Sequence, residues 1–329
     1  MKVLVTGAAG FIGSHLVDKL VKEGHQVICI DDFSGGSADN IDPKLDGYDA
    51  DCRNQQLIDG IFEQHKPEVV FHLAANAAEN KAQFSPIDIT SRNYDAFIKV
   101  LTPFIKYGGR RFIFTSSIAV YGALQTPFYE DHSPEPEDLY GITKLAAEQT
   151  LKVMSRVHRF EYIIARPHNV YGERQNMRDP YRNVVTIFMN AMMKKQPCYI
   201  YGDGNQKRQF TYVSDVIDQL YASISSIPNT TFNLGYSVPY TINQLLDTIE
   251  KVSGIKAIRK YLPERPQEVK EAIADHSRAN LYLAKSEFPL KEGLQRAWIW
   301  AKRQGAQEPK YDKLEISSPK APMNWLIKS

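Results

Sequence analysis

The sequence predicts an α/β fold with a doubly wound parallel sheet and a smaller C-terminal lobe interleaved with it. In residues 1–169, strand-like and helix-like segments alternate, which is typical of parallel sheets with helical crossovers. Most of the strand-like segments are almost wholly apolar, as expected when helices cover both faces of a sheet. A glycine-rich turn also joins the first strand to the first helix.

Each element of this half follows from its own residue pattern. Strands are predicted where short runs are rich in Val, Ile, Phe and Leu, at 2–6, 25–30, about 48–52, 68–75, 110–117 and 161–167. Helices are predicted where apolar residues recur three and four apart, at 11–22, in the segment that ends near residue 65, at about 86–107 and at 139–158.

After Asn169 the alternation stops. Residues of about 170–207 and 236–304 are predicted to form the smaller lobe, whereas about 208–235 is predicted to return to the domain formed by 1–169. From 305 to 329 the sequence is polar with scattered proline, so we expect a loosely attached tail.

Composition excludes several classes of partner. The chain has 329 residues and a net charge of +2, so we expect neither a nucleic-acid nor a membrane partner. No apolar run reaches the roughly 20 residues of a membrane helix, and the strand at 2–6 leaves no room for a signal peptide. Cys29, Cys52 and Cys198 are far apart and lack metal-ligand spacing. We therefore expect reduced cysteines, no metal site and a cytoplasmic location.

The glycine-rich turn GAAGFIG lies at residues 7–13. Glycines at such positions permit a tight turn, a close approach of the backbone to a pyrophosphate and close packing of the helix on the sheet. Amides at the helix N-terminus then face the phosphates. We predict a dinucleotide site, with a plain structural turn as the alternative; its residues are Gly7, Gly10, Phe11, Ile12 and Gly13.

Acidic residues end the second strand, at Asp31 and Asp32. A carboxylate about 20 residues beyond the glycines can accept hydrogen bonds from both ribose hydroxyls and would repel a 2′-phosphate, which favours NAD over NADP. The alternative is that Asp31 caps a turn. Asp51 and Cys52, at the end of the third strand, could meet the adenine or form a strand-end turn.

A second set of polar residues lies further along the chain. The strand at 110–117 ends in Ser116 and Ser117, and Tyr140 and Lys144 lie four residues apart on one face of a predicted helix. This spacing is common by chance, but here it follows a glycine turn, an acid and a Ser-Ser pair in order. The alternative is a surface tyrosine and lysine with a strand-end serine.

In this order the motifs resemble those of the extended short-chain dehydrogenase/reductase family, in its NAD-dependent nucleotide-sugar epimerase and dehydratase branch, and UDP-glucose 4-epimerases in particular. The resemblance runs from residue 1 to about 300 and rests on HLAA (72–75), TSSIAVYG (115–122), YGITK (140–144), RPHNVYGERQN (166–176), GDGNQKRQFTYVSDV (202–216) and ERPQEV (264–269). It implies a Rossmann domain that binds NAD and a lobe that binds a nucleotide sugar. It also implies cofactor contacts at Leu73, Ala74, Ala75, Asn93, Ser116, Tyr140, Lys144 and Pro167.

By this resemblance Tyr140 is the catalytic base, Lys144 tunes it and bonds the nicotinamide ribose, and Ser117 orients the reacting hydroxyl. A free tyrosine, with a pKa of about 10, is a poor base at neutral pH. A nearby ammonium and a positive nicotinamide ring would stabilise the tyrosinate and lower that pKa. Ser117 and Tyr140 would both contact the sugar.

Residues that related enzymes use for other reactions are absent. Related dehydratases carry an Asp-Glu pair where this chain has Ser116 and Ser117, and related decarboxylases carry Glu where it has Ala119. Relatives that epimerise carbons 3 and 5 carry a Cys in place of the Ser. The remaining reaction is oxidation and re-reduction at carbon 4, through a 4-keto sugar that turns over in the site.

The resemblance also implies substrate contacts. Asn169 matches a residue that contacts the substrate phosphate, Arg208 and Arg265 match two phosphate-binding arginines, and Asn183 lies where a nucleotide contact is usual. A guanidinium fork suits phosphate oxygens, although a surface ion pair is the alternative for either arginine. His168 is expected to pack rather than to react.

One departure bears on the sugar. Many UDP-galactose 4-epimerases carry a bulky tyrosine where this chain has Ala272. A small side chain leaves room beside carbon 2, so we expect N-acetylated sugars to be tolerated. Some relatives carry a lysine where this chain has Ala77, which bears on reactivity rather than on the class.

Two alternatives stay open. The substrate could be UDP-glucuronate or a GDP-, CDP- or dTDP-sugar, because base recognition relies on backbone contacts and variable loops. The protein could also be a catalytically silent NAD-binding scaffold or sensor, although intact Ser117, Tyr140 and Lys144 argue against this.

Family members usually form homodimers through two long helices, here about 88–107 and 139–158. The apolar residues that could face a partner, or equally the sheet, are Leu101, Phe104, Ile105, Leu151 and Met154.

Overall fold

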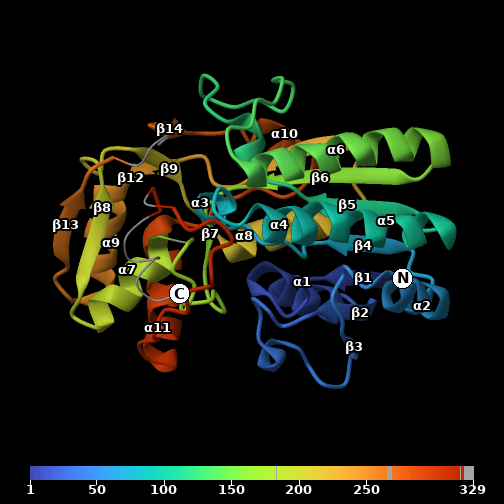
Figure 1. Ribbon diagram of the computed structural model, residues 1–329, viewed down its shortest axis with the longest axis horizontal. Coiled ribbons are helices and arrows are strands. Elements are labelled where there is room, and N and C mark those ends of the chain that lie inside the picture. Colours follow the sequence, from blue (N-terminus) through green and yellow to red (C-terminus); the bar gives the residue numbers. More distant parts are fainter. Residues whose placement is uncertain (183, 265–268, 319, 322–329) are drawn as a thin grey trace.

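The computed structural model describes residues 1–182, 184–264, 269–318 and 320–321. Its centre is a seven-stranded parallel sheet in the order β11-β6-β5-β4-β1-β2-β3 (Figure 1). The strands are β1 (Lys2–Thr6), β2 (Gln26–Asp31), β3 (Asp46–Asp49), β4 (Val69–His72), β5 (Arg111–Thr115), β6 (Glu161–Pro167) and β11 (Thr230–Leu234). The chain runs outward from β1 to β3 and then returns to β4, so the switch point lies between β1 and β4. The predicted doubly wound fold is confirmed.

Helices cover both faces of this sheet. They are α1 (Phe11–Lys22), α2 (Gln55–His65), α3 (Glu79–Ala82), α4 (Pro86–Thr90), α5 (Ala96–Lys106), α6 (Leu139–His158) and α8 (Val213–Ala222). Val3 and Val5 pack in a cluster with α1 and α8, whereas Leu4 between them packs in a cluster with α2, α5 and α6. Because successive strand residues face opposite sides, both faces demand apolar residues. In the described part of the chain, no helix has the length and apolar character needed to cross a membrane.

Two element boundaries differ from the prediction. The strand predicted at about 48–52 is β3 at Asp46–Asp49, because Asp51 Oδ1 accepts from the backbone N–H of Arg53 at 2.8 Å and turns the chain. The helix predicted at about 86–107 is α4 and α5 joined by a π-helical turn at Ser91–Asp95. Such a turn places one extra residue in the helix.

The second half of the chain builds small sheets beside the main one (Figure 1). They contain β7 (Val170–Tyr171) with β10 (Thr211–Tyr212), β8 (Pro197–Tyr201) with β13 (Ile258–Leu262), and β9 (Lys207–Gln209) with β12 (Pro239–Thr241) and β14 (Glu271–Ala272). The lobe helices are α7 (Val184–Met193), α9 (Ile242–Ser253), α10 (Ser277–Tyr282) and α11 (Leu290–Gln304). The segment predicted to return to the main domain, about 208–235, begins inside β9, which belongs to a small sheet. The elements of this segment that pack on or pair with the main sheet are α8 and β11.

The expectation of a loosely attached tail is wrong for its described residues. Leu314 and Ala321 are only 5% and 4% exposed and pack in one cluster with Ala78 and Tyr181. The composition of the tail is polar and Ile316 is exposed, but Leu314 and Ala321 pack into the body of the protein.

The apolar residues considered for a homodimer mostly face the sheet. Leu101, Phe104 and Leu151 are at most 2% exposed and belong to the core cluster under α5 and α6. The exposed apolar residues of α6 are instead Ile142, Val153 and Val157. The homodimer itself stays a prediction.

A buried ion pair joins α6 to the end of β6. Arg166 and Glu148 have side-chain exposures of 1% and 0%, and Nη2 of the arginine lies 2.5 Å from Oε2 of the glutamate. Glu148 Oε1 also accepts from Ser116 Oγ at 2.6 Å, and Arg166 Nη1 donates to Tyr121 Oη at 2.7 Å. Tyr121 donates in turn to Asn233 Oδ1 at 2.8 Å. This network holds the carboxyl ends of β5, β6 and β11 against α6.

A second buried contact joins the end of β6 to the small lobe. His168 and His276 approach to 2.7 Å between their Nε2 atoms, and His168 Nδ1 lies 3.1 Å from the Gln209 carbonyl. Both rings are at most 3% exposed. Burial lowers the pKa of His168 to about 4, so the pair is neutral at physiological pH.

The buried ion pair predicts a large cost for removing one partner. Arg166→Met leaves Glu148 charged and buried, so the free energy of unfolding should fall by about 3–5 kcal/mol, measured by urea denaturation. The exposed Arg156→Met is the matched control and should change it by less than about 0.5 kcal/mol. Adding Glu148→Leu to Arg166→Met should restore part of the loss. Equal stability of the two single variants would refute the role of the pair.

The histidine pair predicts a pH-dependent stability. The folded-state pKa of His168 lies below its unfolded value of 6.5, so the unfolded chain binds more protons between the two values. Stability should be full above about pH 6.5 and fall as the pH drops toward 4. The double variant His168→Asn/His276→Asn should lose ~2 kcal/mol of this dependence in urea titrations at several pH values. An unchanged pH slope would contradict the assignment.

Candidate active site

A cavity of about 690 Å³ lies at the carboxyl edge of the main sheet and is lined by residues of both halves of the chain. This edge, beside the topological switch point, is where doubly wound sheets bind ligands. The predicted residues that line it are Gly7, Gly10, Phe11, Ile12, Gly13, Asp31, Asp32, Asp51, Cys52, Leu73, Ala74, Ala75, Ser116, Ser117, Tyr140, Lys144, Pro167, Asn169 and Arg208.

The glycine turn is packed too tightly for side chains. A methyl group at Gly13 would lie 2.0 Å from the Gly7 carbonyl oxygen, and Gly7 itself has a φ of +69°. Gly10, the N-cap of α1, supplies no side-chain cap, so the amides of the first turn stay available for an anion. This backbone cradle fits a dinucleotide pyrophosphate.

Asp31 both holds a turn and lines the cavity. Its Oδ2 accepts from the Ala9 amide at 2.9 Å and its Oδ1 from the Phe33 amide at 2.8 Å, so it does hold the turn. It also lines the cavity, where burial raises its pKa and the two backbone hydrogen bonds oppose that rise. Asp32 pairs instead with Arg92, at 2.8 Å.

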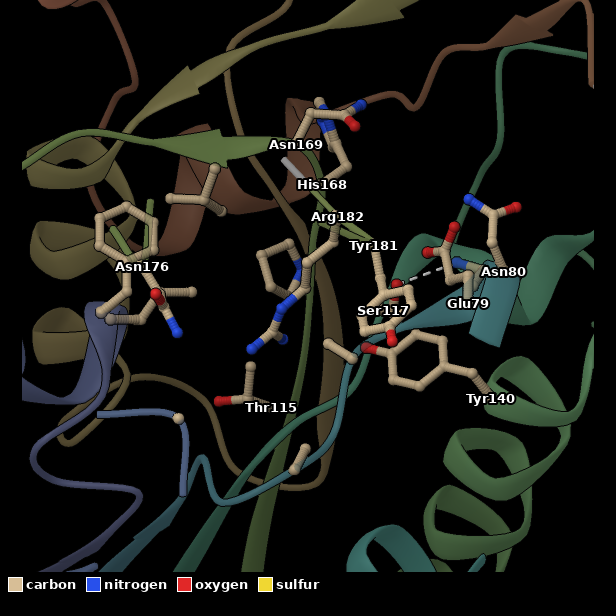
Figure 2. A pocket seen from close by; sticks show the side chains of 18 of the residues that line it. Glu79, Asn80, Thr115, Ser117, Tyr140, His168, Asn169, Asn176, Tyr181 and Arg182 are labelled. Atoms are coloured by element: carbon tan, nitrogen blue, oxygen red, sulfur yellow. Dashed lines mark hydrogen bonds between the residues drawn. The ribbon is translucent and has the colours of Figure 1, made fainter. Parts of the chain in front are cut away.

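Ser117, Tyr140 and Lys144 meet at one end of the cavity. Asp138 caps α6 by accepting from the Gly141 amide at 2.8 Å, which places Tyr140 in the first turn of the helix. Lys144 Nζ lies 5.8 Å from the centre of the Tyr140 ring and donates to the Thr115 carbonyl at 2.8 Å. Figure 2 shows Ser117 and Tyr140 together on one side of the pocket, beside Glu79 and Tyr181.

The surroundings of Tyr140 within the protein raise its pKa. Burial raises the pKa of Tyr140, the charge of Glu79 adds to this, and a hydrogen bond with Ser117 opposes it. Burial also lowers the pKa of Lys144, to about 7. The physical reason is that both groups are buried to the same depth, and a low dielectric disfavours each charged form.

Asn93 is predicted to contact the cofactor but is not among the residues that line the cavity. Asn93 lies behind the cavity wall, where its Oδ1 accepts from the Asn76 amide at 2.8 Å and its Nδ2 donates to Thr143 Oγ1 at 3.3 Å. It braces the cavity and does not line it. Asn183 and Arg265 lie outside the described residues.

The two described polar residues predicted to contact the diphosphate come from different elements. Asn169, with a φ of +39°, lies at the end of β6, and its carbonyl accepts from the Thr211 amide at 3.3 Å. Arg208 lies on β9, and its Nη2 donates to the Val269 carbonyl at 2.6 Å.

Several cavity residues escaped the sequence prediction. Glu79 and Asn80 follow the strand-end motif HLAA, so their position at the carboxyl edge of β4 could have singled them out. Arg182 carried no such signal. Its loop folds back from the small lobe, and its Nη2 would lie 3.9 Å from a methyl group at Gly35, across the cavity. Figure 2 shows Arg182 reaching into the pocket.

The comparisons with known proteins agree with this geometry. Residues 3–235 match the NAD dependent epimerase/dehydratase family. The chain is 32% identical over 305 residues to the UDP-glucose 4-epimerase of Mycolicibacterium smegmatis, a match that covers 89% of this chain and 96% of that protein.

Two solved structures extend the likeness to the fold. The UDP-glucose 4-epimerase of Thermotoga maritima with UDP-glucose is 34% identical with a TM-score of 0.88, over 92% of this chain and 99% of that one. The UDP-N-acetylglucosamine 4-epimerase of Methanobrevibacter ruminantium in complex with UDP-N-acetylmuramic acid is 31% identical with a TM-score of 0.86, over 92% and 98%. The family match spans more than half of the chain, and the cavity is lined by both the glycine cradle and the Ser117, Tyr140 and Lys144 set. This protein therefore belongs to the NAD dependent epimerase/dehydratase family.

Proposed function

We propose that this protein catalyses the NAD-dependent epimerisation of a UDP-sugar at carbon 4. The observation that carries the proposal is that Ser117, Tyr140 and Lys144 line the same cavity as the glycine cradle. A hydroxyl to be oxidised and a dinucleotide can therefore lie side by side. The similarity to 4-epimerases of UDP-glucose and UDP-N-acetylglucosamine supports the same reaction.

Tyr140 and Ser117 have separate roles in the proposed proton transfer. Tyr140 takes the proton of the 4-hydroxyl and later returns it, while Ser117 hydrogen-bonds the reacting oxygen. Bound NAD supplies the acceptor, and later the donor, of the hydride at carbon 4. Because burial opposes a tyrosinate, the proposed reaction requires positive charge beside Tyr140. Lys144 Nζ, 5.8 Å from the centre of the Tyr140 ring, supplies it in its protonated form, and a bound nicotinamide ring would add to it.

Glu79, which lies beside Tyr140 on the same side of the pocket (Figure 2), bears on the choice of sugar. Glu79 interacts electrostatically with Tyr140 and raises its pKa, so its carboxylate stands near the reacting end of the cavity. The carboxylate of a uronic-acid sugar would be repelled by the Glu79 carboxylate at this end of the cavity. This ranks neutral hexoses ahead of glucuronate.

Ala272 also lines the cavity, on β14. Its small side chain supports the proposal that N-acetylated sugars are accepted as well. For the diphosphate we propose contacts with Asn169 and Arg208, together with Asn183 and Arg265.

We further propose a cytoplasmic homodimer. The three cysteines are free and buried, as a reducing compartment would leave them. The exposed Ile142, Val153 and Val157 offer α6 an apolar face for a second copy.

Tyr140→Phe tests the reaction. Loss of the phenol hydroxyl should lower kcat at least a hundredfold, measured by NMR from the interconversion of UDP-glucose and UDP-galactose. The variant should still bind NAD. Tyr129→Phe, a change at a half-exposed tyrosine, is the control and should leave kcat unaltered. A Tyr140→Phe enzyme as fast as the parent would sink the proposal.

A panel of UDP-, GDP-, CDP- and dTDP-sugars, including UDP-glucuronate, tests the substrate. Exchange should be fastest with neutral UDP-hexoses. Bound NAD without exchange of any sugar would favour the scaffold alternative.

Ala272→Tyr tests the sugar subsite. The larger ring should lower kcat/KM for UDP-N-acetylglucosamine about tenfold or more by steric exclusion, and change that for UDP-glucose little. Ala272→Gly, which adds no bulk, should retain both activities. Equal effects of the tyrosine on both sugars would disprove the role of this position.

A further inference from the structure

We propose that residues 306–318, defined here as the strap, cross from the small lobe to the main domain and position two walls of the active site. One wall is the loop that carries Tyr181 and Arg182; the other is α3, with Glu79 and Asn80. Asp312 is the central positioning residue, because it contacts both walls. The inference rests on the proposed function only in that both concern the same cavity.

The strap begins on the small lobe. Gln307 and Asn190 of α7 exchange two hydrogen bonds, from the Gln307 amide to Asn190 Oδ1 and from Asn190 Nδ2 to the Gln307 carbonyl, both 2.8 Å long. The Lys310 amide then donates to the Arg178 carbonyl at 2.8 Å. The strap thereby follows the backbone that leads to Tyr181 and Arg182.

At its middle the strap joins the two walls. The Asp312 amide donates to Tyr181 Oη at 2.8 Å, and Asp312 Oδ2 lies 2.6 Å from Lys81 Nζ. The Lys81 side chain is only 5% exposed and its Nζ lies 5.5 Å from the centre of the Tyr181 ring. An ammonium at this depth depends on its acidic partners.

The far end lies on the main domain. Both carboxylate oxygens of Glu315 accept backbone amides at the start of α4, from Ile87 and Asp88, each at 2.8 Å. The Ile316 amide donates to the Phe84 carbonyl at 2.9 Å. The segment from α3 to α4 is therefore held at both ends by the strap.

A series of ion pairs connects the strap to the cofactor side of the cavity. Lys81 also approaches Asp88, at 3.3 Å, and Asp88 pairs with Arg92 at 2.8 Å. Arg92 pairs in turn with Asp32, at 2.8 Å, beside the acid predicted to bind ribose. Loss of the Asp312 carboxylate leaves Lys81 with Asp88, for which it competes with Arg92. A change in the strap can thus reach the dinucleotide site through contiguous ion pairs.

The test uses the full-length chain with bound NAD. Asp312→Asn keeps the shape and removes the charge, and Asp312→Asn/Glu315→Gln weakens both contacts with the main domain. Three quantities are measured: the rate of NAD release, KM and kcat for UDP-glucose, and hydrogen exchange of the amides at 79–88. Lys313→Gln, a change at an exposed strap residue, is the matched control.

In the double variant the rate of NAD release and the KM should each rise on the order of fivefold or more, whereas kcat should change far less. Hydrogen exchange of the amides at 79–88 should become faster. Asp312→Glu, which restores the charge, should recover most of the loss. Asp312→Asn and Lys81→Met should combine less than additively, because they share one contact.

NAD release and KM equal to those of Lys313→Gln would overturn the proposal, even if the melting temperature fell, because a merely structural role moves only stability. The NAD measurement needs no turnover. It therefore still tests the strap if no UDP-sugar is exchanged, which would be a failure of the proposed function alone.

Discussion

The buried ion pair between Glu148 and Arg166 is the constraint on which the reacting end of the cavity depends. Glu148 lies four residues after Lys144, which lies four residues after Tyr140, so all three share one face of α6. Fixing the glutamate against β6 therefore fixes the rotation of the helix. The direction in which the tyrosine and the lysine point follows from an ion pair that includes neither residue.

The same burial that makes this arrangement rigid works against the chemistry. Tyr140 and Lys144 are both pushed toward their neutral forms, the lysine to a pKa of about 7. A positive group brought close to them would reverse part of that effect for the tyrosine. The proposed role of Tyr140 as a base therefore requires positive charge beside it.

The two lobes are joined by contacts of different physical kinds. The imidazoles of His168 and His276 meet without charge in the interior. Asn233 bridges the same region by donating to the Phe128 and Asp275 carbonyls, at 3.1 and 3.2 Å. The strap adds a peripheral, charged connection through Lys81 and Asp312. The walls of the cavity are thus held from behind by the interior contacts and from outside by the strap.

The sequence by itself determined the parallel sheet, the glycine cradle, Asp31 and the meeting of Ser117, Tyr140 and Lys144. The sheet, the cradle and Asp31 depend on spacing within one strand or one turn, and on the rule that carboxyl ends of parallel strands share an edge. The meeting of Ser117 with Tyr140 and Lys144 is predicted from the family resemblance of the ordered motifs. Only the tertiary structure decided that Arg182 crosses the cavity, that Glu79 raises the pKa of Tyr140 and that the polar tail is anchored. Those outcomes depend on burial and on contacts between residues far apart in the chain. Asp312 and Lys81 are 231 positions apart, for example, and no local pattern records such a pair.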